Sequence, residues 1–319
     1  MVGRNWQPSI SAENLRKRAQ LLSATRAFFS ARDVCEVQTP IVATAGNPDV
    51  HIDSIEVNLS AGAYDTERGY LNTSPEFCMK RLLAAGSGDI YQLCSAFRAG
   101  EAGCWHNPEF TILEWYRLGF SMQQLMDEVA ALVSQLYGAE LPLRFITWAE
   151  AWTHKGINPN DETALNQSLG AMQIDVPAGL SLSELQDLAF SFVVQPDLGE
   201  QGLCFVYHYP AEQASLARLS PDDDSVAERF ELFWQGVELA NGFVELVNAQ
   251  EQRQRFQADN QQRLAAAKPQ VREDERFLAA LEAGLPECAG VAVGFDRLVA
   301  LLLEQARLED VITFNASRS

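Results

Sequence analysis

This 319-residue sequence has no long apolar segment, no closely spaced pair of cysteines and few basic residues. No apolar run approaches about 18 residues, the length that a transmembrane helix needs. The first residues lack the apolar segment of a signal peptide, so we expect a cytoplasmic protein with no membrane partner. The six cysteines form no C-x-x-C pair, and no histidine lies at ligand spacing from one of them. This pattern argues against a zinc site and favours reduced, buried thiols.

Basic residues are few, with 24 Lys and Arg against 43 Asp and Glu and a net charge of −19. A field of this sign repels phosphate backbones at long range, although it leaves room for a local basic groove. We therefore do not expect tRNA or another nucleic acid to be the main partner. Hydrophobic residues make up 47% of the chain, enough for one large core or two modest ones.

The first sixty residues are predicted to hold a helix and two strands. The helix covers 11–30, with Ser11 as its N-cap. A strand over 34–42 follows, and Pro40, which cannot donate to a ladder, marks an edge or an interface. Residues 51–57 alternate as a second strand. The apolar stripe of the helix is expected at Leu15, Ala19, Leu22 and Phe29.

Residues 89–117 are predicted to form strand, loop and strand. The first strand alternates and ends with Arg98, and the second places Glu114 and Tyr116 on one face. Such a hairpin can line a cleft with both signs of charge. That cleft would suit a zwitterionic substrate next to an anionic one.

Thr73-Ser74-Pro75-Glu76 precedes a helix that we expect to begin near Phe77. Ser74 or Thr73 can cap this helix, Pro75 suits its first turn, and Glu76 complements its positive end. Helix capping alone would explain this four-residue segment. The alternative interpretation is that it binds an amino-acid substrate.

The middle of the chain is predicted to be a helix at 122–137 and then a mostly helical insertion, about 141–200, packed on the catalytic sheet. A capping box at Ser181 opens one helix of this insertion. Two antiparallel strands follow, 228–236 and 237–246. A bulge at Asn241-Gly242 would bring Glu238 and Glu245 to one face, and two buried carboxylates there favour metal or cation binding.

Gly290–Leu298 has the pattern of an apolar strand, a glycine and a helix. Gly294 permits a planar base to approach the backbone closely. Arg297 falls in the first helical turn, where a helix N-terminus also favours anions. The polar helix expected over 250–267 is given no role.

These segments resemble the three motifs of the class II aminoacyl-tRNA synthetases. The helix, strand and Pro40 are similar to motif 1, Arg98 with 106–110 and Glu114 to motif 2, and 290–298 to motif 3. The chain most resembles the lysyl-tRNA synthetases, and among these the truncated paralogues that ligate (R)-β-lysine to elongation factor P. The resemblance implies an α+β catalytic domain, an antiparallel sheet flanked by helices, as one domain over 1–319 and as a homodimer.

The resemblance also implies ATP and Mg²⁺ as cofactors, elongation factor P as acceptor, and (R)-β-lysine or lysine as the amino acid. Arg98, Arg297 and Glu238 would act in catalysis. The amino acid would contact Ser74, Pro75, Glu76, Tyr116, Glu245 and Ala292. ATP would contact Arg98, Ala99, Gly100, Glu101, Asn107, Glu238, Leu239, Gly294 and Arg297. The metal would be held by Glu238 and Glu245.

Three departures from full synthetases bear on function. No anticodon-binding barrel precedes the first helix, and Ala292 replaces the middle glycine of motif 3. Gly100 stands where the family has a glutamate that contacts adenine, and Glu101 follows it. A truncated synthetase that charges tRNA, another tRNA-independent class II ligase and a non-catalytic regulatory paralogue therefore stay open.

Overall fold

The computed structural model describes residues 6–60, 62 and 64–319. Its contacts divide the chain into two compact units. The first comprises Met1–Phe120 and Val247–Ser319, and the second comprises Ser121–Leu246. Within the described residues, no helix is long and apolar enough to cross a membrane.

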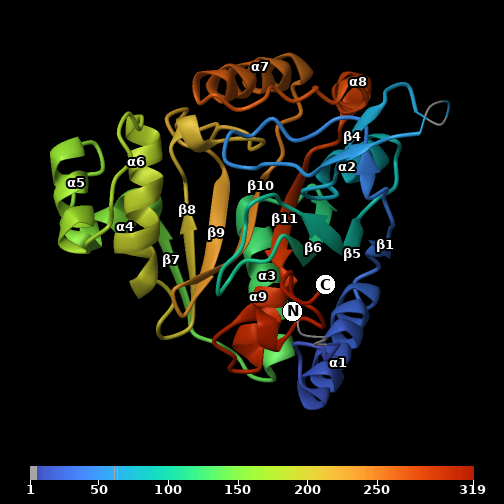
Figure 1. Ribbon diagram of the computed structural model, residues 1–319, viewed down its shortest axis with the longest axis horizontal. Helices are drawn as coiled ribbons and strands as arrows, with labels where there is room; N and C mark the ends of the chain where they lie inside the picture. Colours follow the sequence, from blue (N-terminus) through green and yellow to red (C-terminus); the bar gives the residue numbers. More distant parts are fainter. Residues whose placement is uncertain (1–5, 61, 63) are drawn as a thin grey trace. The chain divides into compact units, whose positions relative to one another are not determined.

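The strands of the larger sheet that belong to the first unit have the order β1-β5-β6-β11 (Figure 1). β1 (Cys35–Glu36) pairs parallel with β5 (Ile90–Phe97), whereas β5 with β6 (Glu109–Leu118) and β6 with β11 (Cys288–Gly294) are antiparallel. The hairpin is therefore confirmed. Its register sets Gln92, Glu114 and Ala292 side by side in one row. The expected strand over 34–42 is wrong, because only β1 and β2 (Val42–Ala43) form and Pro40 lies between them.

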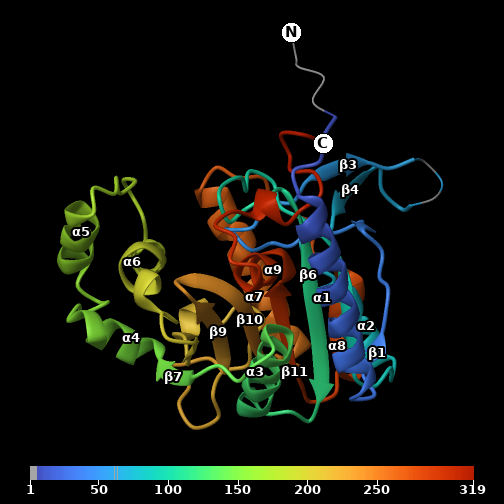
Figure 2. The same cartoon turned by 90° about the horizontal axis from the view of Figure 1, so that it is seen from below.

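Helix α1 (Ala12–Ser30) lies along this sheet (Figure 2), and Ser11 caps it by accepting from the Asn14 amide. Phe29 stacks on Tyr91 and packs edge-on against Trp115. The predicted stripe is partly wrong. Leu15 is exposed, and the buried residues are Thr25, Phe28 and Phe29.

A small sheet and further helices complete the described part of the first unit. The small sheet has the order β2-β4-β3, with β4 at Arg68–Leu71 and β3 at Glu56–Asn58, shorter than the strand expected over 51–57. Helices α2 (Glu76–Ala84), α7 (Ala249–Ala265) and α8 (Glu275–Gly284) meet through Phe77, Phe256 and Phe277. Helix α9 (Phe295–Leu302) follows β11 and buries its apolar face.

The second unit has the strand order β10-β9-β8-β7. β7 (Leu143–Thr147) is parallel to β8 (Leu203–Tyr207), and β9 (Arg229–Trp234) and β10 (Val237–Val244) form the expected hairpin. Gln235 and Gly236 make its turn with positive φ angles of 52° and 73°. α3 (Met122–Tyr137) packs against β9 and β10. The bulge is real, but it lies between Glu238 and Ala240 and not at Asn241-Gly242.

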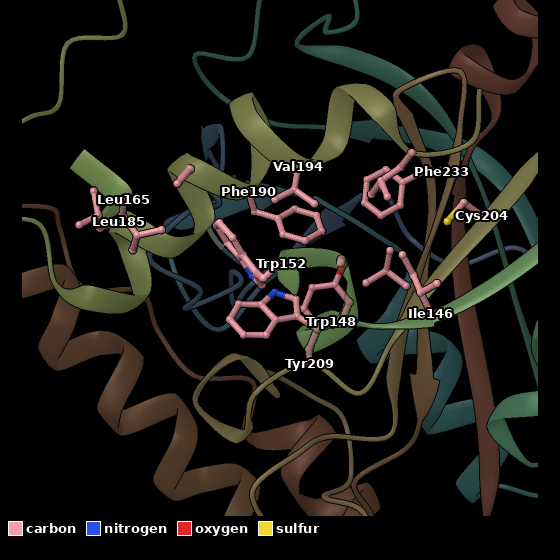
Figure 3. Close-up of a cluster of buried hydrophobic side chains, with 14 of the residues drawn as sticks. Ile146, Trp148, Trp152, Leu165, Leu185, Phe190, Val194, Cys204, Tyr209 and Phe233 are labelled. Carbon is pink, nitrogen blue, oxygen red and sulfur yellow. The ribbon is translucent and has the colours of Figure 1, made fainter. Parts of the chain in front are cut away.

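Residues 148–197 are helical as expected: α4 (Trp148–Lys155), α5 (Glu162–Ala171), α6 (Leu182–Ala189), a π-helical turn (Phe190–Val194) and a 3₁₀ turn (Gln195–Asp197). The Ser181 capping box is present. Figure 3 shows their shared core, in which Trp148, Trp152 and Phe190 meet Phe233 of β9. Strand β7, which precedes these helices, was not expected.

Candidate functional site

The centre of the first unit's site is the buried carboxylate of Glu114 on β6, which is 3% exposed. Ser74 donates its hydroxyl to Oε2 at 2.6 Å, and Tyr116 donates to Oε1 at 2.6 Å. Burial, reinforced by the nearby Glu76 carboxylate, raises the pKa of Glu114 to about 7, although both hydrogen bonds and Lys80 oppose the shift. The structure thus joins the predicted residues Ser74 and Tyr116 through a carboxylate that can gain or lose a proton near neutrality.

Glu76, at the start of α2, has an internal partner. Lys80, one turn later and fully buried, donates to Glu76 Oε1 at 2.6 Å and lies 5.6 Å from the Phe277 ring centroid. Ser74 Oγ also accepts from the Glu76 amide, so Ser74 orients this turn although Pro75 occupies the N-cap position. A small cavity of about 50 Å³ lies beside this segment and is lined in part by Asn72, Ser74 and Glu76.

Arg98 follows β5, and the hydrogen-bonding capacity of its guanidinium is only partly used by the protein. Its side chain lies 3.7 Å from Glu101 and 5.1 Å from the Phe110 ring centroid. Its buried Nε has no hydrogen-bond partner within the part of the chain that the structure describes. A guanidinium with an unused N–H can donate a hydrogen bond to a phosphate or carboxylate oxygen.

Gly100 has a conformational reason to be glycine. Its φ is +78°, in the left-handed region that favours glycine. A glutamate there would be strained, so restoring the family's residue by Gly100→Glu is not a simple gain of function in this loop. Glu101, beside Arg98, is the carboxylate that this loop offers.

Arg297, in the first turn of α9, reaches the same loop. Its Nε donates to the Trp105 carbonyl at 3.2 Å, and NH2 lies 2.7 Å from Nε2 of His106. The preceding residue, Asp296, is 2% exposed and fixes this turn by accepting from the Thr111 amide at 2.7 Å. Asp296 also pairs with Arg18 of α1 at 2.6 Å, so elements of all three motifs meet at one carboxylate.

Asn107 and Gly294 are also expected to contact the nucleotide, and they differ in whether the protein itself already fills their surroundings. The Asn107 amide donates to the Glu109 carbonyl at 2.5 Å, and its oxygen accepts from the Ala316 amide at 3.0 Å. At Gly294 an added Cβ would come no closer than 3.5 Å to Arg297, an ordinary contact. The protein itself therefore does not require glycine at 294, which is consistent with space kept for a ligand.

Ala292 lies on β11 directly opposite Glu114. Directly opposite residues of an antiparallel pair project to the same face of the sheet. Its methyl group therefore shares the face of the Glu114 carboxylate, as the predicted amino-acid contact requires.

Glu238, Leu239 and Glu245 belong to the second unit. The bulge sets Glu238 opposite Phe233 and Asn241 opposite Glu231, so Glu238 and Asn241 share a face. Glu245 is 1% exposed. Carboxylate oxygens suit Mg²⁺, which is usually held by one or two carboxylates together with phosphates and water. Among the described residues no group of three or more His, Cys, Asp or Glu side chains is arranged to hold a metal.

Another carboxylate of this unit, Glu231 on β9, is 13% exposed. Arg229 donates to Oε1 at 2.5 Å and Tyr209 to Oε2 at 2.6 Å. Arg229 also donates to the Gln213 carbonyl and to Asn241 and stacks 4.4 Å from the Tyr209 ring centroid. Glu231 thus has a fixed cationic partner inside the protein.

The cysteines are free, as expected, but they are not all buried. Cys35 and Cys104 are exposed, whereas Cys204 and Cys288 are buried. Burial, together with the nearby Glu114, raises the pKa of the Cys94 thiol to about 12. Cys94 is therefore a neutral side chain beside Glu114 and no nucleophile.

The sequence predicted no role for Lys80, His106 or Asp296, and it placed Glu114 on the cleft face of the hairpin without a contact of its own. Lys80 could have been found by its i,i+4 spacing from Glu76. No local signal marks Asp296 or His106, because their partners are distant in the chain.

Comparison with known proteins identifies the family of this chain. The family model described as tRNA synthetases class II (D, K and N) matches residues 6–318. A relative from Edwardsiella ictaluri (strain 93-146), named elongation factor P–(R)-β-lysine ligase, is 47% identical over 99% of this chain and 98% of its own. Relatives of the same name from Pectobacterium carotovorum subsp. carotovorum (strain PC1) and Salmonella arizonae are 46% and 45% identical, each covering at least 98% of both chains. The expected fold class is thereby confirmed, and this chain belongs to the class II tRNA synthetase family.

Proposed function

We propose that this protein is an ATP-dependent ligase that activates (R)-β-lysine as an adenylate and transfers it to a lysine side chain of elongation factor P. The observation that carries the proposal is the Glu114 carboxylate, which is buried and held by the Ser74 and Tyr116 hydroxyls. Such a group can accept a substrate ammonium in a desolvated pocket. Relatives that bear this activity in their names, at 45–47% identity over nearly the whole chain, support it.

The proposed reaction has two steps. A carboxylate oxygen of the amino acid attacks the α-phosphorus of ATP, and the bond to pyrophosphate breaks. The ε-amine of the acceptor lysine then attacks the acyl carbon, loses a proton, and AMP leaves. The amino-acid carboxylate is ionised at neutral pH, so the first step needs no general base, and positioning and charge neutralisation carry the catalysis.

Different side chains of the protein would supply this positioning and charge neutralisation. Arg98, with its unused Nε, and Arg297, held by Asp296, would neutralise the α-phosphate and the carboxylate. Mg²⁺, when bound, would neutralise the leaving pyrophosphate, with Glu238 and Glu245 as its proposed ligands. Asn107, Gly294, Leu239 and the residues 99–101 are the proposed nucleotide contacts.

The proposed contacts with the amino-acid substrate follow from the charges that the substrate carries. The substrate carries two ammonium groups and one carboxylate. Glu114, Glu76 and Glu245 are the proposed partners of the ammonium groups, with Ser74, Pro75, Tyr116 and Ala292 shaping the pocket. We propose further that the enzyme acts as a homodimer in the cytoplasm, where the translation factor works, and that its net charge of −19 disfavours tRNA.

The experiment that tests the function is mass spectrometry of elongation factor P after incubation with the protein, ATP, Mg²⁺ and (R)-β-lysine. We expect a mass gain of one lysyl group on one lysine. Charging of tRNA without any modification of elongation factor P would identify a truncated synthetase instead. Absence of ATP–pyrophosphate exchange with every amino acid offered would identify a non-catalytic paralogue.

A further inference from the structure

Helix α7 holds a distant loop through two cationic side chains. Arg263 is 3% exposed and donates to the carbonyls of Asp49 (2.8 Å) and Ile52 (3.2 Å) and to Oδ1 of Asp53 (3.0 Å). Lys268, just beyond the helix, donates to the Val50 carbonyl (2.8 Å) and to Oδ2 of Asp53 (3.0 Å). We call Arg263, Lys268 and the loop 49–53 the α7 clasp.

The clasp is built as a rigid unit. The Arg263 Nε donates to the Pro269 carbonyl at 2.9 Å, and the Lys268 amide donates to the Arg263 carbonyl at 2.8 Å, so the two cations are fixed relative to each other. Burial alone would raise the pKa of Asp53, but the hydrogen bonds from Lys268 and Arg263 hold it below its ordinary value. Asp53 therefore stays ionised and keeps both cations in place.

The loop in turn holds the backbone next to Arg98. The carbonyl of Asp53 accepts a hydrogen bond from the Ala99 amide at 2.7 Å. The amides of Phe97 and Arg98 donate to Asn72 and Pro108 at 2.9 Å each. Of these three anchors, only Asp53 lies on the side of Arg98 that leads into the loop 99–103.

The Arg98 side chain itself is restrained weakly. Among the described residues its one ion pair, with Glu101, is 3.7 Å long, and 29% of its side chain is exposed. Where a side chain has few fixed contacts, the position of its backbone decides where its charge can reach. A misplacement of about 1 Å in such a group can cost 100-fold in rate.

We propose that the α7 clasp is a positioning device for the loop that carries Arg98, so that Arg263 and Lys268 act on ATP through Asp53 and Ala99 without touching it. The proposal rests on the ATP-binding role of this loop. It gives a function to a helix whose sequence is mostly polar. It also explains why Arg263 is buried while the residues on either side of it, Gln262 and Leu264, are exposed.

The test uses three variants on α7 and the segment after it. Lys268→Met removes a half-buried cation whose loss the fold can tolerate, and Arg263→Lys keeps the charge but loses the fork of donors. Arg253→Gln is the matched control, because this arginine of α7, half-buried like Lys268, pairs among the described residues with Glu273 and Glu275 and not with the loop 49–53. The first readout is hydrogen exchange of the segment 98–103 without ATP. The second is KM for ATP beside KM for (R)-β-lysine.

We expect Lys268→Met and Arg263→Lys to speed exchange of 98–103 and to raise KM for ATP by about 10- to 100-fold, with a smaller change in KM for (R)-β-lysine. Arg253→Gln should change neither readout. Unchanged exchange in both variants would overturn the clasp. Faster exchange with an unchanged KM for ATP would show that the clasp holds the loop without positioning the nucleotide. If the parent protein binds no ATP, the proposed function fails, while the exchange data still decide whether the clasp holds the loop.

Discussion

Each unit contains a carboxyl group whose pKa is raised to about 7 by burial, Glu114 in the first and Glu231 in the second, and the two charges are compensated in different ways. Glu231 receives a guanidinium and a hydroxyl, from Arg229 and Tyr209. Glu114 receives two hydroxyls, from Ser74 and Tyr116, and the nearest cation, Lys80, is bound to Glu76. Burial raises the pKa of both carboxyls, but only Glu231 has a cation in direct contact to oppose it.

This difference distinguishes Glu231, a carboxylate that stabilises the fold, from Glu114, a carboxylate that we propose binds the substrate. A buried charge needs a countercharge, and Glu231 finds it within the protein. Among the described residues Glu114 has hydrogen bonds that orient it but no cation at ion-pair distance, so we propose that a substrate ammonium completes its charge. The comparison predicts that damage to Glu231 lowers stability, whereas damage to Glu114 lowers substrate affinity.

The largest effect is expected from Arg229→Met. This change leaves Glu231 buried without its cation, which should cost about 3–5 kcal/mol in the free energy of unfolding. Urea denaturation followed by fluorescence measures it. The double variant Arg229→Met/Glu231→Leu should recover most of the loss, because an apolar pair leaves no buried charge. A loss below about 1 kcal/mol, as for exposed ion pairs, would remove the contrast between the two sites.

Glu114→Gln should act on binding. We expect KM for (R)-β-lysine to rise about 100-fold or more, since removal of one partner of a buried ion pair costs about 3–5 kcal/mol. KM for ATP should change little. The control is Glu109→Gln on the same strand, an exposed carboxylate bound only to Ser95. An unchanged amino-acid KM in Glu114→Gln would make Glu114 structural, like Glu231.

Local sequence patterns were enough to find these strands but not the partners of their acids. Period two predicted the β5–β6 hairpin and the shared face of Glu114 and Tyr116, and Gln235-Gly236 was correctly placed at a turn. The bulge was misplaced, because its position depends on which residues of β9 face β10 and not on β10 alone. Asn241-Gly242, chosen for its glycine, pairs regularly with Glu231 and Phe230.

The polar helix α7 shows a second limit. Its hydrophobicity predicts a solvated helix, yet it buries Gln252, Phe256, Asn260 and Arg263 along one face. Arg263 can be buried because the carbonyls of residues about 210 positions earlier accept hydrogen bonds from its guanidinium. Such a partner has no sequence signature. The same holds for Asp296, whose role depends on Arg18 and Thr111.

Ala292 tests the shape of the pocket around Glu114. Because its methyl group shares the face of Glu114, we expect it to crowd the position of an α-amino group and so to disfavour L-lysine. Ala292→Gly should raise kcat/KM for L-lysine relative to (R)-β-lysine by roughly 10- to 200-fold, the range for one methylene-sized change. Pyrophosphate exchange with both amino acids gives the ratio. A constant ratio would mean that Ala292 only packs against the neighbouring strand.

The proton on Glu114 should make binding depend on pH. A carboxyl whose pKa is raised to about 7 in the folded protein is protonated below that value, and only the ionised form attracts an ammonium. KM for (R)-β-lysine should therefore rise about tenfold per pH unit below pH 7 and level off above it. In Glu114→Gln the dependence over this window should vanish. A parent profile that is flat between pH 6 and 8 would contradict the raised pKa.

The smallest effects should come from removing one hydroxyl at each site. Tyr116→Phe deletes a hydrogen bond that favours ionised Glu114, so the pKa of Glu114 should move further above 7 and the pH profile of the amino-acid KM should shift upward. A hydrogen bond worth about 1–1.5 kcal/mol corresponds to a shift of about one unit. Tyr209→Phe removes the equivalent hydroxyl from Glu231, but Arg229 remains. It should therefore cost about 1 kcal/mol of stability and leave the pH profile in place. Equal shifts in both variants would show that the profile reports a general property of the protein rather than the proton on Glu114.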